Sequence, residues 1–135
     1  MPKTAVLPTN KDTAYPCRSR RDAGTEGETL AAEALEKKGM QVVGRNIRSK
    51  TGEIDLIALD NEALVFVEVK NWQAYGMENL MFGISPRKQR RIIETAKYYL
   101  ASHRKYSNNL IRFDVVFLQS GKPMVHLVSA FSESQ

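Results

Sequence analysis

The sequence predicts a single α/β domain with two helices and a sheet of about five strands, and three observations lead to this prediction. Two segments carry apolar residues at helical spacing, residues 25 to 38 and 86 to 102. Short apolar runs with strand character separate and follow them, in the order helix, three strands, helix, strand, strand. The 135 residues make one domain with a sizeable core and are too few for two.

The first 22 residues are expected to form a flexible basic arm, so that the domain spans residues 23 to 135. They mix Pro, Thr, Asn and charged residues without any hydrophobic period. Arg18, Arg20 and Arg21 end the arm, and a short run of this kind is more often a solvated tail than a phosphate-binding element. Cys17 has no histidine nearby in sequence, and we assign it no role.

A first helix is predicted at residues 25 to 38, with Gly39 as its C-terminal stop. Its apolar arc consists of Leu30, Ala31, Ala34 and Leu35. Glu28 falls inside this arc, near its edge. Two interpretations are equally supported: Glu28 faces the acidic strands described next, or it is a first-turn acid favoured by the helix dipole.

The strands that follow are predicted at residues 40 to 43 and in a hairpin at residues 52 to 70, GEIDLIALDNEALVFVEVK. The near-continuous apolar character of the hairpin marks both of its strands as inner strands of the sheet. Its short connection at residues 60 to 62 favours antiparallel pairing.

Charged residues inside this hairpin are the strongest functional signal. Strict alternation places Glu53 and Asp55 on the face of Ile57 and Leu59. The same rule places Glu68 and Lys70 on the face of Phe66. Antiparallel pairing then brings Asp55 and Glu68 side by side, with Lys70 one pleat away.

Such a constellation suits a hard divalent cation such as Mg²⁺ or Mn²⁺, which takes carboxylate oxygens, keeps several waters and lowers the pKa of a water that attacks phosphorus. Lys70 is placed to orient that water or to neutralise phosphate charge. The alternative is that the charges cap strand ends or form a buried salt bridge. Because three charges converge with an excess of acid, we prefer the metal-site hypothesis.

A second helix is predicted after a loop at residues 71 to 84, with Ser85 as N-cap and Pro86 as first helical residue. Its apolar positions are Ile92, Ile93, Ala96, Tyr99 and Leu100. Lys88 lies one and two turns before Ile92 and Ala96, so it is expected to project from the core-facing side into the acidic cleft.

More outward-pointing residues on this helix are expected at Arg87, Arg90 and Arg91, which together with Lys88 are candidates for contacting nucleic acid. The last two strands are predicted at residues 111 to 118 and 124 to 128, after a turn at residues 121 to 123. Asp114 and His126 on these strands are expected to be satisfied structural groups.

Composition narrows the function classes. Twenty Lys and Arg against fifteen Asp and Glu give a net charge of +5 and a pI near 9.4, which favours a polyanionic partner. A single cysteine excludes an internal disulfide framework and a cysteine-built zinc site. Without a signal-like apolar segment or a run of transmembrane length, a soluble cytoplasmic protein is expected.

The element order, with Glu on the first helix, Asp on the second strand and Glu-Val-Lys on the third, resembles the PD-(D/E)XK nuclease superfamily, and within it the YraN-like group of small predicted endonucleases. The resemblance covers residues 24 to 131. Its most specific parts are GTEGETLAA at 24 to 32, GEIDLIA at 52 to 58 and FVEVK at 66 to 70, supported by Lys88 and by RFDVV at 112 to 116. It implies a restriction-endonuclease-like core, a central mixed sheet flanked by helices.

By this resemblance, Asp55 and Glu68 are metal ligands and Lys70 is the catalytic lysine. Glu28 matches a helix-one glutamate that the Holliday-junction-resolvase branch of the superfamily uses near its metal. Glu53 belongs to the GEID pattern, and support of the metal ligands or strand-end pairing is its expected role. The group commonly carries Arg two residues after the lysine, where this chain has Trp72.

The expected function is therefore a divalent-metal-dependent endonuclease or phosphodiesterase acting on DNA, with branched and single-stranded DNA among the candidate substrates and Mg²⁺ or Mn²⁺ as cofactor. The alternatives are a non-catalytic nucleic-acid-binding module and an interaction subunit of a DNA-processing assembly. Nucleic acid, with DNA first, is the expected partner. A homodimer is left open, and no membrane association is expected.

Overall fold

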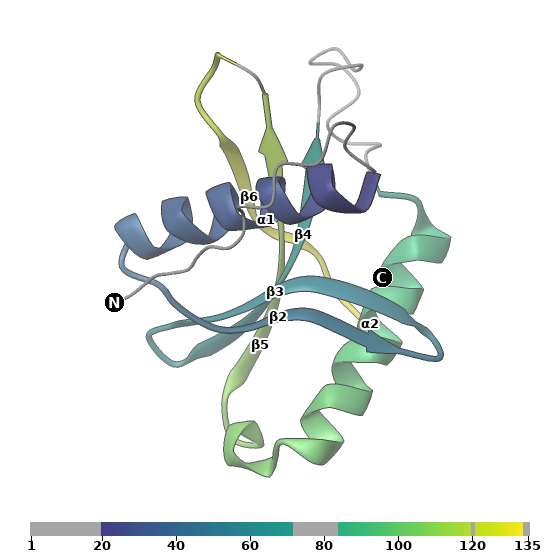
Figure 1. Ribbon diagram of the computed structural model, residues 1–135. Helices are drawn as coiled ribbons and strands as arrows, with labels where there is room; N and C mark the ends of the chain where they lie inside the picture. The colour runs from purple at the N-terminus through teal and green to yellow at the C-terminus, as the bar shows by residue number, and fades with distance from the viewer. Residues whose placement is uncertain (1–19, 72–83, 120, 134–135) are drawn as a thin grey trace.

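The computed structural model describes residues 20–71, 84–119 and 121–133, and Figure 1 shows their arrangement. Side chains are described from residue 26 onward. The elements are α1 (Arg20–Lys37), β2 (Gln41–Ser49), β3 (Gly52–Asp60), β4 (Ala63–Asn71), α2 (Pro86–Ser102), the short 3₁₀ helix η2 (Arg104–Tyr106), β5 (Leu110–Leu118) and β6 (Val125–Phe131). The predicted α/β class and element order are confirmed.

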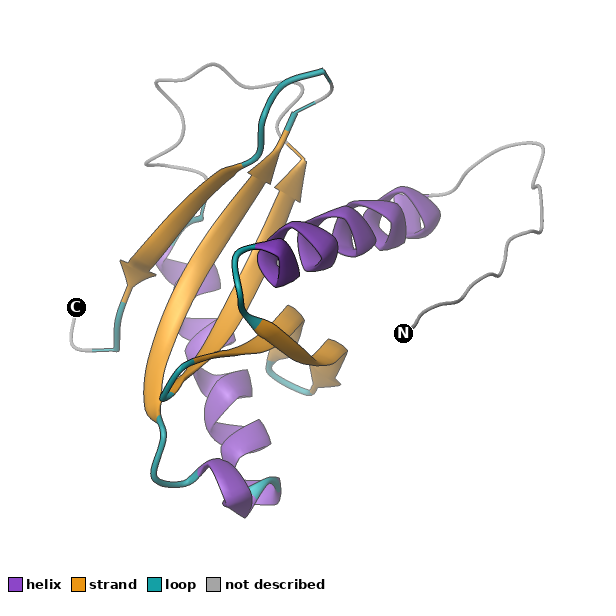
Figure 2. Cartoon of the chain, turned by 90° about the vertical axis from the view of Figure 1, so that its left-hand side faces the viewer, coloured by secondary structure: helices purple, strands orange, loops and turns teal. Residues whose placement is uncertain are grey.

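The sheet has five strands in the order β2-β3-β4-β5-β6. Only the β4–β5 pair is parallel, and α2 connects its two strands, as a parallel pair requires. The two helices cover opposite faces of the sheet (Figure 2). The hairpin of β2 and β3 bends away from the direction of the other three strands (Figure 1).

Side-chain alternation on the central strand β4 separates two hydrophobic clusters. Val65 and Val67 pack in the cluster on the α1 face, with Leu35 of that helix. Leu64 and Phe66 pack in the cluster on the α2 face. This alternation puts Glu68, two residues after Phe66, on the α2 face, as the sequence predicts.

The pleat of β3 is interrupted at Asp55. Ile57 belongs to the α2-face cluster and Leu56 to the α1-face cluster, yet Ile54 also packs on the α2 face. Strict alternation would place Ile54 with Leu56, so the prediction that Asp55 simply shares the face of Ile57 is wrong. On β2 the residue opposite Asp55 is Asn46, which lies between the pairs Arg45↔Leu56 and Ile47↔Ile54 and has a φ of 52°.

Helix α1 and strand β2 are longer than predicted. The helix begins at Arg20 rather than at residue 25, so residues 20 to 22, which were expected to belong to the arm, are helical. Strand β2 continues from the predicted end at residue 43 to Ser49, because pairing with β3 overrides the turn-forming Gly44 and Asn46. Residues 1 to 19 of the predicted arm lie outside the described residues, as do Trp72 and most of the predicted loop, residues 72 to 83.

The second helix and the C-terminal strands agree closely with the prediction. The hydroxyl of Ser85 accepts a hydrogen bond from the amide of Lys88 at 3.1 Å, and Pro86 begins the helix. Strand β5 starts one residue early, at Leu110, and β6 runs to Phe131 rather than to residue 128.

Candidate metal centre

Four elements bring charged side chains together at the point where β3 leaves β4. Glu28 comes from α1, Asp55 from β3, Glu68 from β4 and Lys88 from α2. Glu28 is 8% exposed and Glu68 is 5% exposed, and each of the two interacts electrostatically with Asp55. The three carboxylates predicted from the sequence therefore form one cluster, which we call the acidic cluster.

Asp55 occupies the centre of this cluster because the β3–β4 pairing stops beside it. The pairing ends at Leu56 and Val67. The next residues beyond this pair are Asp55 on β3 and Glu68 on β4, which are neighbours as predicted. Beyond this point a side-chain hydrogen bond replaces the backbone pairing: Oδ2 of Asp55 accepts a hydrogen bond from the amide of Val69 at 2.8 Å. This bond fixes an acid of β3 against the backbone of β4.

Glu28 faces the acidic strands, so of its two interpretations the structure favours this one. Because α1 begins at Arg20, Glu28 lies more than two turns inside the helix, beyond the reach of a first-turn dipole effect. Burial, followed by the charge of Asp55 and a hydrogen bond with it, raises the pKa of Glu28 from 4.5 to about 7, against opposing effects of Asn46 and Arg45. Its Oε1 is buried and has no hydrogen-bond partner among the described residues.

Glu68 forms an ion pair with Lys88, with 2.7 Å between Oε2 and Nζ. Burial and the charge of Asp55 raise the pKa of Glu68 to about 7, although Lys88 and Lys70 act to lower it. Burial acts to lower the pKa of Lys88, but the neighbouring carboxylates, Glu68 first, raise it overall. The prediction that Lys88 projects into the acidic cleft is confirmed.

The remaining predicted site residues differ in how exposed their side chains are. Lys70 is half-buried on β4, and its charge acts on Glu68. Glu53 is exposed and pairs with Arg48 on β2 at 3.7 Å, which is the strand-end pairing expected for it. The predicted phosphate-contacting residues Arg87, Arg90 and Arg91 are all exposed on the first turns of α2.

Two residues of β2 were not predicted to belong here. Asn46 forms a hydrogen bond that acts to stabilise the charged form of Glu28, and Arg45 acts on the same carboxyl while donating to the hydroxyl of Thr29 at 2.7 Å. They were missed because the strand was expected to end at residue 43. The sequence signal was Asn46 directly before the β-forming Ile47, since Asn adopts positive φ more readily than most residues.

The acidic cluster supplies carboxylate oxygens that a metal site requires, and the other ligands of a bound ion would be water molecules. Among the described residues, no group of three or more His, Cys, Asp and Glu side chains is arranged so that it could hold a metal ion. Mg²⁺ does not require three protein ligands, because it is commonly bound by one or two carboxylates and several waters. The feature that fits a hard cation is the buried Oε1 of Glu28, which has no hydrogen-bond partner among the described residues, although Arg45, Lys70 and Lys88 already act on the acids of the cluster.

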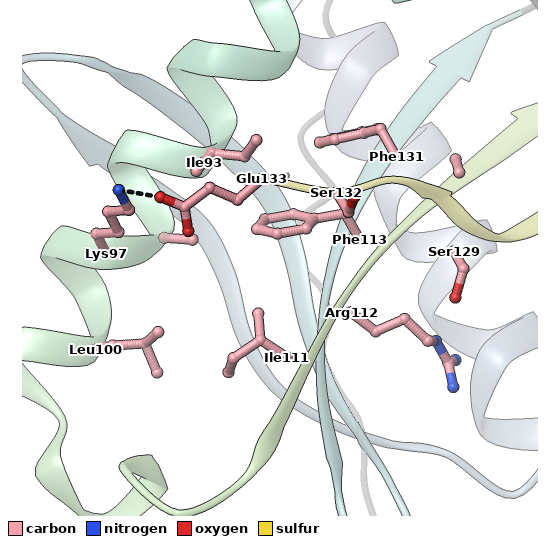
Figure 3. Close-up of a pocket in the computed structure, with 12 residues that line it drawn as sticks. Ile93, Lys97, Leu100, Ile111, Arg112, Phe113, Ser129, Phe131, Ser132 and Glu133 are labelled. Atoms are coloured by element: carbon pink, nitrogen blue, oxygen red, sulfur yellow. Dashed lines mark ion pairs between the residues drawn. The ribbon is translucent and has the colours of Figure 1, made fainter. Parts of the chain in front are cut away.

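A cavity of about 440 Å³ lies elsewhere, between α2 and the ends of β5 and β6 (Figure 3). Phe113, Phe131 and Leu100 line it, and the ion pair of Lys97 with Glu133 borders it. None of the acidic-cluster residues contributes to its wall. This cavity is therefore separate from the acidic cluster.

Neither α1 nor α2 has the length of apolar sequence that a membrane-crossing helix needs.

Comparison with known proteins identifies the family. The model of the uncharacterised protein family UPF0102 matches residues 27–118, which include every residue of the acidic cluster. A UPF0102 protein of Treponema pallidum is 42% identical over 116 residues, covering 82% of this chain and 92% of the relative. Relatives from Treponema denticola, at 41% identity over 82% of this chain and 95% of theirs, and Pseudomonas putida, at 39% over 86% and 98%, are similar to it along nearly their whole length. The chain therefore belongs to the UPF0102 family, the YraN-like proteins.

Proposed function

We propose that this protein is a divalent-metal-dependent phosphodiesterase that cleaves DNA. The observation that carries the proposal is the acidic cluster, in which Glu28 and Glu68 are buried next to Asp55 and the Oε1 atom of Glu28 has no partner among the described residues. A buried carboxylate oxygen without a partner is costly, and such groups are found mainly where they serve a function. A divalent cation offsets this cost.

Each residue has a distinct role in this proposal. Asp55 and Glu68 hold the cation, and Glu28 supplies a further carboxylate from the opposite face of the sheet. When bound, Mg²⁺ or Mn²⁺ lowers the pKa of a water and stabilises negative charge on phosphate. Lys70, on the same strand as Glu68, orients the attacking water and neutralises charge that develops on the phosphate.

DNA is the proposed substrate because the exposed basic residues of α2 adjoin the acidic cluster. Lys88 contacts Glu68 directly, and Arg87, Arg90 and Arg91 are exposed on the same two turns of helix. Guanidinium groups bind phosphate in a bidentate manner without reading sequence. Branched and single-stranded DNA are the substrates to test first.

A cleavage assay tests the proposal. The purified protein is incubated with labelled linear, nicked, flapped and four-way DNA in Mg²⁺, in Mn²⁺ and in chelator. The control is Asp55→Asn, prepared identically, which keeps an oxygen acceptor for the Val69 amide but removes the charge. Metal-dependent cleavage by the wild type alone supports the proposal. Equal cleavage by the two proteins, or none by either on any substrate, contradicts it.

A non-catalytic nucleic-acid-binding module or a subunit of a DNA-processing assembly is the second candidate, and one observation favours it. The ammonium group of Lys88 lies 2.7 Å from Glu68 and already neutralises part of the acidic charge without a metal. DNA binding in chelator without cleavage in metal would support the binding module. Absence of both would favour the interaction subunit.

A further inference from the structure

The turn between β2 and β3 packs on α2 through a group of three hydroxyl side chains. The hydroxyl of Thr51 lies 2.9 Å from that of Thr95, and Ser49 lies 2.8 Å from Thr51 and 3.3 Å from Thr95. Thr95 in turn donates to the carbonyl of Arg91 at 2.8 Å. These bonds fix the turn against the second and third turns of the helix.

Close backbone packing fixes the turn further. A Cβ on Gly52 would lie 3.4 Å from the Cβ of Arg91, so the turn approaches this arginine directly. Lys88, Arg91 and Thr95 are spaced three and four residues apart, so they lie along one face of α2. Arg91 therefore stands between the acidic cluster, reached by Lys88, and the turn, reached by Thr95.

The turn carries two exposed cations of its own, Arg48 and Lys50. Glu53 is the acid beside them, and its ion pair with Arg48 at 3.7 Å is exposed and therefore weak. We call Arg48, Lys50 and Arg91 the basic turn surface, since Arg48 lies on the strand that enters the turn, Lys50 lies in the turn and Arg91 lies against Gly52 at its end. Seven residues of helix separate Lys88 from Thr95, about 10 Å, which corresponds to about three base-pair steps along a DNA strand.

We propose that the basic turn surface binds the phosphate backbone of DNA on the side of the acidic cluster formed by the β2–β3 turn. The inference rests on the proposed function, and it adds Arg48 and Lys50 to the nucleic-acid-binding residues. Phosphates are the proposed partner because the cations are exposed and contacts with the phosphate backbone need no base readout. The hydroxyl contacts fix the turn that carries Lys50 before DNA arrives, which lowers the entropic cost of binding.

Binding in chelator tests the inference without relying on cleavage. Fluorescence anisotropy of labelled duplex and four-way DNA is measured over a salt series for the wild type and for Arg48→Gln/Lys50→Gln. The matched control is Arg104→Gln/Lys105→Gln, which removes the same two residue types, both exposed, beyond the other end of α2. The turn variant is expected to bind about ten-fold more weakly, with a salt slope smaller by about two. The control is expected to bind nearly as the wild type does.

A charge-neutral variant tests the part played by the turn contacts. Thr51→Val keeps the shape of an exposed side chain and removes its hydroxyl bonds to Ser49 and Thr95. It is expected to weaken binding about three-fold and to leave the salt slope unchanged, because no cation is lost.

The outcomes separate this inference from the proposed function. If the wild type binds DNA and the turn variant and its control lose the same affinity, the proposed role of the basic turn surface is wrong. The nuclease proposal is then unaffected. Binding by neither wild type nor variant to any DNA overturns both. Cleavage that fails while the turn variant binds selectively more weakly supports the surface and contradicts only the catalytic proposal.

Discussion

Buried acids lie in two regions of this domain, around Asp114 and in the acidic cluster, and the two regions differ in how far hydrogen-bond donors compensate the acids. Asp114 on β5 is fully buried, and its two oxygens accept four hydrogen bonds: two from Arg112 at 2.9 Å, one from His126 at 2.8 Å and one from the amide of Ser129 at 3.0 Å. Burial acts to raise the pKa of Asp114, but these donors hold it below its usual value. In the acidic cluster, burial prevails and raises the pKa of Glu28 and of Glu68 to about 7.

The network around Asp114 extends to further partners, which confirms its prediction as a satisfied structural group. Lys38 donates a hydrogen bond to Nδ1 of His126 at 2.7 Å. Since an ammonium group can only donate, Nδ1 is the acceptor, and the imidazole donates a hydrogen bond from its Nε2–H to Asp114. Arg112 also pairs with Asp60 at 3.0 Å. Every charge in this region has an internal partner, so the region needs no ligand.

Compensation therefore distinguishes the two groups better than burial does. Both oxygens of Asp114 accept hydrogen bonds from donors that fold with it, whereas in the acidic cluster Oε1 of Glu28 is buried without a hydrogen-bond partner among the described residues. The first arrangement stabilises the fold. The second raises the pKa of Glu28 and of Glu68, and under the proposed function a bound cation would offset the cost of their ionised forms.

The largest expected effect separates activity from stability at Asp55. In the proposed nuclease, Asp55→Asn should reduce metal-dependent cleavage about 1,000-fold, or about 4 kcal/mol of transition-state stabilisation. Unfolding of the metal-free variant should occur at the same or a higher temperature, because repulsion among the acids falls while Val69 keeps an acceptor. Cleavage rates and thermal melts of the same preparations check this. A variant that unfolds early would place Asp55 with the structural acids.

Asp114→Asn should show the opposite pattern. Breaking a buried, fully paired charge costs about 3 kcal/mol, because the 19% exposed side chain of Arg112 loses one of its two charged partners and keeps only Asp60. Urea unfolding measures the free energy, and cleavage per folded molecule should be unchanged. Glu68→Gln is the matched control in the acidic cluster and should not lower stability. Equal losses for Asp114→Asn and Glu68→Gln would erase the distinction between the two groups.

Lys70 tests whether a lysine beside the acidic cluster acts on the reaction or only balances charge, as Arg112 does for Asp114. Lys70→Met should lower turnover about 100-fold and leave Mg²⁺ affinity nearly unchanged, because the proposed work of Lys70 lies with the water and the phosphate. Calorimetry of Mg²⁺ binding and single-turnover cleavage measure the two quantities. A large loss of metal affinity with no specific loss of rate would make Lys70 a structural partner.

The smallest expected effect is in the pH dependence of stability, where the two groups have opposite signs. Glu28 and Glu68 have pKa values raised from 4.5 to about 7, so their contribution is present below 4.5 and is lost as the pH rises through 7. The pKa of Asp114 is lowered from 3.8, so its contribution is present above 3.8 and is lost as the pH falls further. The melting temperature should fall by a few degrees between pH 5 and pH 8.

Variants and metal identify the source of this decline. Glu28→Gln/Glu68→Gln should flatten the pH dependence above 4.5 and leave the acid side unchanged. Mg²⁺ should raise the melting temperature of the wild type at pH 8 more than at pH 5, because the ligands are then ionised. A melting temperature that rises from pH 5 to pH 8 in chelator would mean that the acidic carboxyls are compensated after all.

The sequence by itself determined the parts of this protein that depend on neighbouring residues. Alternation along β4 assigned Glu68 and Phe66 to one face, and the sequence Ser85-Pro86 located the start of α2, because pleat and capping are local geometry. The short connection after Asp60 gave the antiparallel register that makes Asp55 and Glu68 neighbours.

Tertiary structure alone decided how the acids converge. The sequence left the orientation of Glu28 open, and it was resolved by the packing of α1 across the sheet and by a helix start at Arg20. The break in the pleat at Asp55 and the positive φ of Asn46 arise where β2 and β3 bend away from β4, which no window of local sequence records. Local periodicity fixes which face a residue takes, whereas the distance between residues on different elements depends on how the elements pack.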